Sequence, residues 1–161
     1  MTAPRSPRGW RRVEVATLQS QAVHAGFAYW NGLRRGRLFP ARSDVSPRGA
    51  GNLLRHVVIL SVTGPPRDYL FRIVGDEVEG AYNLALSNKR LSEVRAARPE
   101  TGDALQEILQ GVCGDGQPFA CRNWLETQTT GETFALREAV FLPLGERAPV
   151  VDHVLVVDAP V

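Results

Sequence analysis

The sequence contains few cysteines and almost no lysine. Its 161 residues include two cysteines, and Lys89 is the single lysine among the 19 basic residues. Cys113 and Cys121 do not form a C-x-x-C motif and no histidine lies beside them, so we expect no metal site. Buried free thiols are favoured over a disulfide, although the sequence alone leaves a bond between the two cysteines open.

Histidines are equally scarce, and their positions provide no catalytic arrangement. His24, His56 and His153 are far apart in the sequence, and none has the nucleophile or carboxylate spacing that acid or base catalysis requires. Glu77 and Glu79 fit the start of a helix better than a paired acid and base. We therefore expect neither an enzyme activity nor a cofactor.

Long hydrophobic runs are absent as well. No apolar stretch is long enough to cross a bilayer. The first ten residues, M-T-A-P-R-S-P-R-G-W, lack the hydrophobic centre of a secretion signal. The sequence therefore predicts a soluble, cytoplasmic protein with no membrane partner.

The composition fits one globular domain, 43% hydrophobic and 22% charged. The formal net charge is only +2, but arginines crowd the first third of the chain. A basic surface of this kind can meet nucleic acid, anionic lipid or an acidic partner. Nucleic acid is not favoured, because the run lacks the interleaved aromatic residues of single-strand binders. The arginines are Arg5, Arg8, Arg11, Arg12, Arg34, Arg35, Arg37, Arg42, Arg48 and Arg55.

The strongest structural signal is the segment from His56 to Gly75, which reads H-V-V-I-L-S-V-T, G-P-P-R-D and Y-L-F-R-I-V-G. Two runs of β-branched and aromatic residues flank a short segment rich in proline, glycine and aspartate, which predicts an antiparallel hairpin. The first run is apolar on both faces and is expected inside a sheet, whereas Arg72 in the second must reach solvent or a carboxylate.

The segment before the hairpin is predicted to be a tail and a long helix. Residues 1–12 hold two prolines and four arginines, a composition typical of a disordered tail. Residues 13–36 carry apolar side chains at steps of three and four, which predicts an N-terminal helix. Its broad apolar stripe must pack on the back of the sheet or on the same helix of a second subunit. In a homodimer the interface would comprise Leu18, Ala22, Val23, Phe27 and Trp30.

After the hairpin the pattern predicts several helices and then three strands. Short helices are expected near 47–55, after Gly75 and near 88–94, and a longer one from Pro99 to Gly114. The strands are expected from Pro118 to Glu126, Thr133 to Leu144 and Val150 to Asp158. This order predicts a single α+β domain over residues 13–161. Its five-stranded antiparallel sheet would carry the intervening helices on one face, with the N-terminal helix as an addition.

That order of elements is the order of a PAS domain, a sensory module that holds a small molecule or a protein surface between sheet and helices. The stretch H-A-G-F-A-Y-W-N-G-L-R-R-G-R-L-F-P-A-R-S-D-V-S-P, followed by L-L-R-H-V-V-I-L-S-V and Y-L-F-R-I-V-G, resembles a small single-domain PAS family common in alphaproteobacteria. The likeness is closest from about Gly26 to Val94. A-Y-N-L-A-L-S-N-K-R-L departs from the Gly-Arg-Asp-Leu-Thr-Gly-like segment usual there. The resemblance implies a sensor or partner-binding domain without chemistry of its own.

Two groups of residues are candidate binding sites. On the PAS interpretation, large apolar side chains converge between sheet and helices, where they either fill the space or surround a small apolar ligand. Arg37, Arg42 and Ser46 could instead bind a phosphate or carboxylate, but we favour a structural role in which Arg42 pairs with Asp44. The apolar set is Tyr69, Phe71, Leu105, Ile108, Leu109, Trp124, Phe141 and Leu155.

The sequence thus favours a non-catalytic PAS-like regulatory domain of bacterial signalling that binds a partner protein, with homodimerisation through the N-terminal helix. The alternative is a receptor for a small molecule such as an anionic metabolite or a cyclic dinucleotide. D-V-S-P-R-G matches half of the cyclic-dinucleotide signature of PilZ domains, but it precedes a helix instead of lying on a barrel, so we interpret it as a chance match.

Overall fold

The computed structural model describes residues 10–127 and 133–161, and side chains are described for 10–123 and 136–161. Three short 3-10 turns, Val15–Thr17, Arg42–Asp44 and Gly51–His56, accompany the main elements. The helices are α1 (Gln21–Arg34), α2 (Pro47–Ala50), α3 (Asp76–Tyr82), α4 (Leu91–Ala97) and α5 (Pro99–Asp115). The strands are β1 (Trp10–Val13), β2 (Val57–Thr63), β3 (Asp68–Val74), β4 (Phe119–Thr127), β5 (Thr133–Leu144) and β6 (His153–Pro160).

One antiparallel sheet organises the fold, in the strand order β1-β4-β5-β6-β2-β3. The predicted hairpin is present, with Thr63 opposite Asp68 at the turn between β2 and β3. The sheet has six strands where five were expected, because Trp10–Val13 pairs with β4. Residues 10–12 were assigned to the disordered tail, and this part of the prediction was wrong. The rest of that tail, 1–9, lies outside the described residues.

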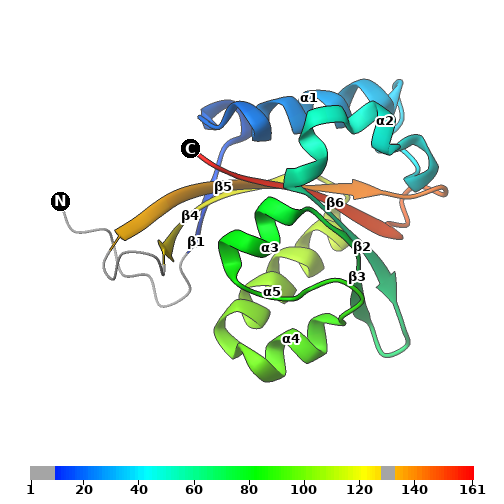
Figure 1. Cartoon of the computed structure of the whole chain (residues 1–161). Helices are drawn as coiled ribbons and strands as arrows, with labels where there is room; N and C mark the ends of the chain where they lie inside the picture. The colour runs from blue at the N-terminus through cyan, green and yellow to red at the C-terminus, as the bar shows by residue number, and fades with distance from the viewer. Residues whose placement is uncertain (1–9, 128–132) are drawn as a thin grey trace.

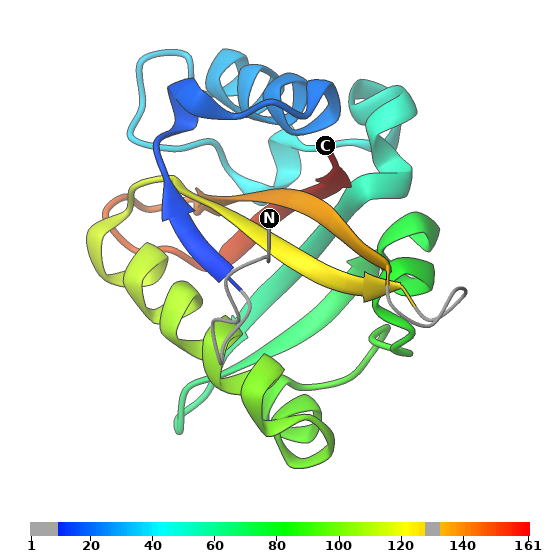
Figure 2. The same cartoon turned by 90° about the vertical axis from the view of Figure 1, so that its left-hand side faces the viewer.

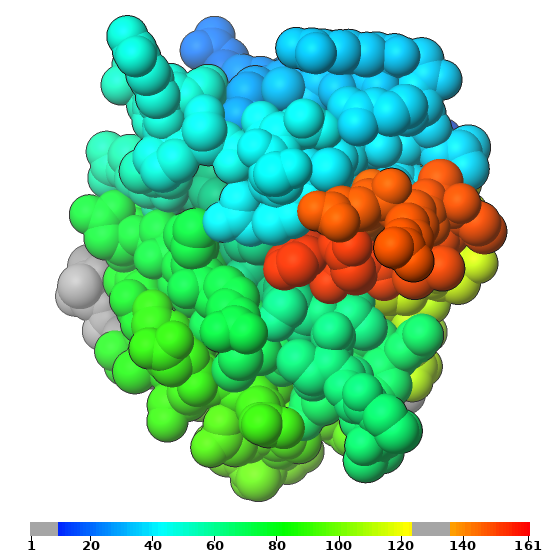
Figure 3. All heavy atoms as spheres, turned by 90° about the vertical axis from the view of Figure 1, so that its right-hand side faces the viewer, coloured from blue at the N-terminus to red at the C-terminus, as the bar shows by residue number. Residues whose placement is uncertain are grey.

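Helices cover both faces of this sheet. Helices α1 and α2 lie on one face, and α3, α4 and α5 lie on the other (Figures 1 and 2). Seen from the side in Figure 3, the two helix layers occupy opposite ends of the molecule. The apolar stripe of α1 therefore packs on the back of the sheet of the same chain, which is one of the two packing partners predicted for it.

Two contacts draw α1 close to the sheet. Gly26 sits so near β6 that a Cβ atom there would lie 2.5 Å from Cγ2 of Val157. The indole Nε1 of Trp30 donates a hydrogen bond to the carbonyl oxygen of Pro143 at 2.9 Å, and the Trp30 side chain is almost fully buried. A small residue and a large aromatic residue thus fit the helix to the curved sheet surface.

Helix α1 begins at Gln21, eight residues later than predicted. Ser20 is its N-cap, and the Ser20 side chain accepts a hydrogen bond from the backbone N–H of Val23. Among the apolar residues before Ser20, Val13 belongs to β1, Val15 to a 3-10 turn, and Leu18 follows that turn. Their spacing of three and four residues matches that of a helical stripe, and Ser20 was not predicted to be the N-cap at which the helix begins.

Candidate functional site

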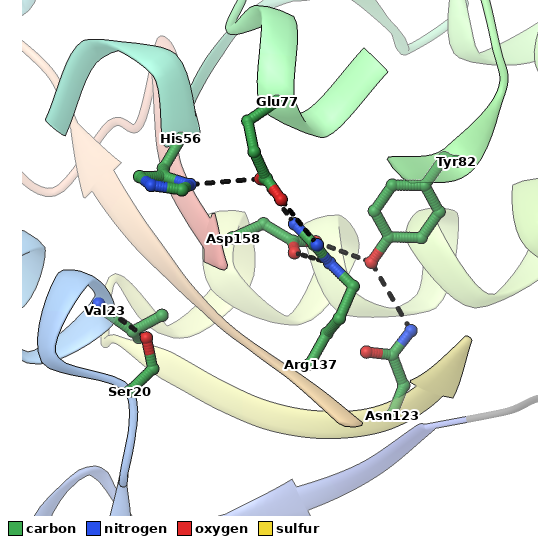
Figure 4. A network of polar contacts seen from close by, with 8 residues as sticks. All are labelled: Ser20, Val23, His56, Glu77, Tyr82, Asn123, Arg137 and Asp158. Carbon is green, nitrogen blue, oxygen red and sulfur yellow. Dashed lines mark hydrogen bonds and ion pairs between the residues drawn. The ribbon is translucent and has the colours of Figure 1, made fainter. Parts of the chain in front are cut away.

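A network of polar side chains lies between α3 and the sheet (Figure 4). Two of its members come from α3, one from the turn before β2, and one each from three neighbouring strands. Hydrogen bonds and ion pairs join all of them. The members are His56, Glu77, Tyr82, Asn123, Arg137 and Asp158.

Strand register brings the three strand residues together. Asn123 of β4 lies directly opposite Arg137 of β5. Asp158 of β6 lies opposite Ala139, which is two residues from Arg137 and therefore on the same face of the sheet. The network consequently stands on the α3 side, and its position follows from alternation along three paired strands.

Arg137 is the centre of the network. Its Nη1 and Nη2 donate to the two carboxylate oxygens of Glu77 at 2.8 Å each, and its Nε donates to Oδ1 of Asp158 at 2.8 Å. The Arg137 side chain is only 4% exposed. A bidentate pair of this kind fixes both position and orientation. Burial alone would raise the pKa of Glu77, but the hydrogen bonds and the charge of Arg137 outweigh it and hold that pKa below its usual value.

Asp158 and Tyr82 form the buried end of the network. The hydroxyl of Tyr82 donates to Oδ2 of Asp158 at 2.6 Å, and Asn123 Nδ2 donates to the Tyr82 oxygen at 3.4 Å. Burial raises the pKa of Asp158 in spite of the attraction of Arg137 and the bond from Tyr82. Burial and the neighbouring carboxylate also raise the pKa of Tyr82 well above its usual value. Tyr82 therefore stays protonated and serves as a hydrogen-bond donor.

The outer end of the network is His56, whose Nδ1 lies 3.1 Å from Oε2 of Glu77. Two carboxylates thus face one guanidinium, and a proton on Asp158, whose pKa is raised by burial, would balance the charge. Cys121 is close by, but burial raises its pKa to about 12, so it remains a thiol and a poor nucleophile. Among the residues that the structure describes, no group of three histidine, cysteine or acidic side chains is placed to hold a metal ion.

A second polar cluster lies on the opposite face of the same strand. Glu138 follows Arg137 in β5 and points to the α1 side. Its Oε1 accepts hydrogen bonds from the backbone N–H groups of Gln19 at 2.7 Å and Ser20 at 2.6 Å, directly before α1. Its Oε2 binds Arg122 at 2.6 Å. Two consecutive residues of β5 therefore hold the two helix layers, Arg137 the α3 layer and Glu138 the α1 layer.

The apolar residues predicted to surround a ligand are only partly brought together. Tyr69, Phe71 and Phe141 meet Ile108 and Leu109 of α5 in one buried cluster, and each of the five is at most 4% exposed. Leu105 packs at its edge, partly buried.

Of the two remaining members of the predicted set, Leu155 belongs to the hydrophobic core but lies on the other face of the sheet. Leu155 is opposite Ile59 and Leu142, one step out of phase with Val156 and Phe141, and so it faces α1 instead. Both faces of β6 are apolar, so the sequence could not show which face Leu155 takes. The side chain of Trp124 lies outside the described residues.

The predicted anion-binding residues make local structural contacts. Arg37, and not Arg42, pairs with Asp44 at 2.8 Å. Arg42 donates to the carbonyl oxygen of Val45 at 3.1 Å, and the Ser46 hydroxyl accepts from the N–H of Gly49 at the start of α2. The N–H of Ala41 and the charge of Arg37 hold the pKa of Asp44 below its usual value. Asp44 is therefore a paired carboxylate, as predicted, but its partner is Arg37 and not Arg42.

Three of the five residues assigned to a dimer interface are buried within the chain itself. Leu18, before the start of α1, is 4% exposed, and Val23 and Trp30 of α1 are 0% and 1% exposed. Ala22 and Phe27 are partly buried. A dimer that used these residues would have to detach α1, because the sheet of the same chain already covers them.

Sequence reasoning missed the central residues of the site, although a signal was present. Arg137 and Glu138 form a charged pair inside the apolar run A-L-R-E-A-V-F-L of a predicted strand. Charged residues in a central strand are seldom buried without a partner. The dipeptide therefore indicated a buried ion pair on each face of the sheet.

Comparisons with known sequences agree with the observed fold. The sequence profile of the PAS domain family matches residues 18–156. A comparison with curated proteins gives no significant match. Within the described part of the chain, no helix has the length and hydrophobicity needed to span a bilayer.

Proposed function

Because the chain belongs to the PAS domain family, a family of sensory and signalling domains, we propose that it is a non-catalytic regulatory domain of bacterial signalling that acts by binding a partner protein. The observation that carries this proposal is the pair Arg137 and Glu138. One holds α3 through Glu77, and the other holds the start of α1 through two backbone N–H groups. A displacement of α3 that disturbs Arg137 can therefore reach the α1 layer through the peptide bond between Arg137 and Glu138.

Helix α3 has the properties of a two-state element. It is seven residues long, and Val78 is its only fully buried residue. Its position therefore depends mainly on the bonds from Glu77 to Arg137 and from Tyr82 to Asp158. Directional bonds of this kind are either made or broken, so the helix is expected to be docked or released without stable intermediate positions. Regulation requires such a bistable element.

The small-molecule receptor remains the second candidate, and one observation favours it. Arg137 holds Glu77 through its two terminal nitrogens, Nη1 and Nη2, beneath a short helix. An incoming carboxylate could take the place of Glu77 and release α3. Native mass spectrometry of the purified chain, followed by thermal shifts with carboxylate metabolites, tests this. An empty protein whose melting temperature no such metabolite changes would remove the candidate.

Homodimerisation stays a prediction. It would have to use the outer side of α1, where Gln21, Ala25 and Ala28 are exposed. Light scattering of the purified chain over a range of concentrations measures it. A strict monomer would contradict it without affecting a partner of a different kind.

Coupling between the layers is tested by hydrogen exchange. Glu77→Gln weakens the bond to Arg137 and should speed amide exchange in α3 and also at Gln19 and Ser20, on the other side of the sheet. Asp103→Asn is the matched control, because Asp103 pairs with Arg95 in an exposed position and should affect only its surroundings. Unchanged exchange at Gln19 and Ser20 in Glu77→Gln would refute the coupling.

Partner binding is tested in bacterial cells that express the full chain. A photo-crosslinking amino acid at Ala28, which is exposed on α1, should give a discrete adduct whose yield changes when Glu77→Gln is added. The control position is Gln110, which is exposed on α5. If neither position gives an adduct to another protein, or if Glu77→Gln leaves every yield unchanged, the proposal is wrong.

A further inference from the structure

The two helix layers carry opposite charge. From the first residue of α1 to the end of the 3-10 turn before β2, residues 21–56 contain six arginines and one acidic residue, a formal charge of +5. From the start of α3 to the end of α5, residues 76–115 contain eight acidic and four basic residues, a formal charge of −4. The modest net charge of the chain therefore conceals a strongly polarised molecule, with each layer on its own face of the sheet (Figure 1).

The positive layer presents most of its charge without a partner. We call its six arginines, Arg34, Arg35, Arg37, Arg42, Arg48 and Arg55, the arginine face. Among the described residues, only Arg37 has a carboxylate within ion-pair distance, that of Asp44. The Arg34 guanidinium stacks over the Trp30 ring at 5.2 Å, and its Nε is buried without a hydrogen-bond partner. Arg35, Arg48 and Arg55 are exposed. Uncompensated cations of this number favour an anionic partner.

The arginine face is continuous across the layer. The hydroxyl oxygen of Tyr29 in α1 accepts a hydrogen bond from the N–H of Ser46, directly before α2, at 3.3 Å. This contact places α2 beside α1. The ion pair between Arg37 and Asp44 joins the end of α1 to the next turn in the same way. The elements that carry the arginines are therefore neighbours in one layer.

Exposed aliphatic side chains accompany these arginines. Leu38 is 53% exposed, Leu54 38% and Val150 64%. The segments that carry Leu38 and Val150 are neighbours, because the N–H of Gly145 donates to the Pro40 oxygen at 3.0 Å and the β5–β6 turn packs on this loop. Figure 3 shows the cyan segment and the orange turn side by side. Arginine is enriched at protein interfaces, and the buried centre of an interface is more apolar than the rest of the surface.

The chemistry of this surface favours a protein over the other anionic partners. None of the described aromatic residues between 21 and 56 is exposed, so the stacking platform of single-stranded nucleic acid binders is missing. Three separate aliphatic side chains offer too little apolar area to anchor the domain in a membrane. Every cation is an arginine, whose planar group binds carboxylates with two hydrogen bonds.

We propose that the arginine face, together with Leu38, Leu54 and Val150, is the docking surface for an acidic amphipathic segment of a partner protein. Aspartate and glutamate side chains of that segment pair with Arg35, Arg48 and their neighbours, and its apolar side chains cover the exposed aliphatic residues. This inference rests on the proposed function, since it names the surface and the chemistry by which the regulatory domain would meet its partner.

A labelled peptide tests the inference with the full chain. The probe is a fluorescein-labelled amphipathic helical peptide of glutamate and leucine, and fluorescence anisotropy measures its affinity. Arg35→Glu combined with Arg48→Glu should weaken binding at least about tenfold, because each replacement turns an attraction into a repulsion. Binding by the unchanged chain should also weaken between about 50 and 200 mM salt.

The matched control carries the same change on the opposite layer. Lys89→Glu combined with Arg98→Glu replaces two exposed cations outside the arginine face and should leave affinity within about twofold. Circular dichroism confirms that both double variants are folded. Equal binding by both variants, or tighter binding of a lysine and leucine peptide of the same length, would overturn the inference.

Two further probes decide the class of partner. If anionic phosphatidylglycerol vesicles or a duplex DNA bind more tightly than the acidic peptide, and lose affinity in Arg35→Glu/Arg48→Glu, then the surface is real but the assignment to protein is wrong. Failure of the peptide test leaves the crosslinking test at Ala28 intact, because that experiment detects a partner of any chemistry. Absence of a crosslinked partner would instead defeat the proposed function itself.

Discussion

Replacement of Arg137 by methionine tests the buried network most directly. Methionine keeps much of the volume of the arginine stem but removes three hydrogen bonds, two to Glu77 and one to Asp158. The Arg137 side chain is 4% exposed, and its partners Glu77 and Asp158 are 16% and 10% exposed. Loss of one member of a buried ion pair costs about 3–5 kcal/mol, because the remaining charge stays in the protein without compensation. We expect a loss of this size in the free energy of unfolding near pH 8.

The loss should shrink in acid. In the native protein the pKa of Glu77 is lowered, so its contribution to stability is present above the pKa of an unfolded glutamate and disappears as the pH falls through the folded value. The pKa of Asp158 is raised, so ionising it costs stability as the pH rises. Without Arg137 both carboxyls should hold protons to higher pH. Each unit by which a pKa rises adds about 1.4 kcal/mol to the pH dependence.

Urea unfolding followed by tryptophan fluorescence, from about pH 5 to pH 8, measures these values. Arg95→Met is the control, because the Arg95–Asp103 pair is exposed and should contribute less than about 1 kcal/mol. A loss below about 1 kcal/mol in Arg137→Met at every pH, or a loss that decreases as the pH rises, would refute the reasoning.

Three further expectations concern the α1 layer and the buried thiol. In urea unfolding, Gly26→Ala should destabilise the protein by about 1–3 kcal/mol, because the new Cβ meets Val157. Gly32→Ala should stabilise it by about 0.5–1 kcal/mol, because alanine favours the helix and, among the described residues, no atom beyond the helix backbone and the two chain neighbours lies within 4 Å of the new Cβ. Equal stabilities of the two variants would contradict the contact with Val157. Glu138→Gln should lower the free energy of unfolding by about 3 kcal/mol at neutral pH, because the charge of Arg122 loses its partner. Folding lowers the pKa of Glu138, so the difference between the two proteins should vanish in acid. A difference that persists at low pH would argue against this role. Cys121, with its pKa raised to about 12 by burial, should react with iodoacetamide only after unfolding; mass spectrometry that finds it labelled in the native protein would exclude the burial described.

The sequence predicted those parts of the fold that have long periodic signals. The hairpin from β2 to β3, the helix α5 and the final three strands lie where their patterns placed them. Strand β1 has four residues, W-R-R-V, too few to show an alternation and indistinguishable from a charged tail.

The candidate site was harder to predict, because it depends on register and on the face each residue takes. Leu155 and Val156 are both apolar, and only pairing with β5 shows which of the two faces α1. Both Arg37 and Arg42 are close to Asp44 in the sequence, and the turn after α1 places Arg37 within hydrogen-bond distance of it. Spacing along the sequence could not distinguish these outcomes, because the choice was made by tertiary packing.

The adjacency of Arg137 and Glu138 also has a consequence for folding. The rest of β5 around them is apolar on both sides, so its aliphatic side chains alone would tolerate a shift by one position. A shift in one direction would place Glu138 against Glu77, and a shift in the other would place Arg137 against the N–H groups of Gln19 and Ser20. Either shift would therefore create a repulsion on one face of the strand. Opposite charges on neighbouring residues therefore disfavour misregistered pairing of this central strand.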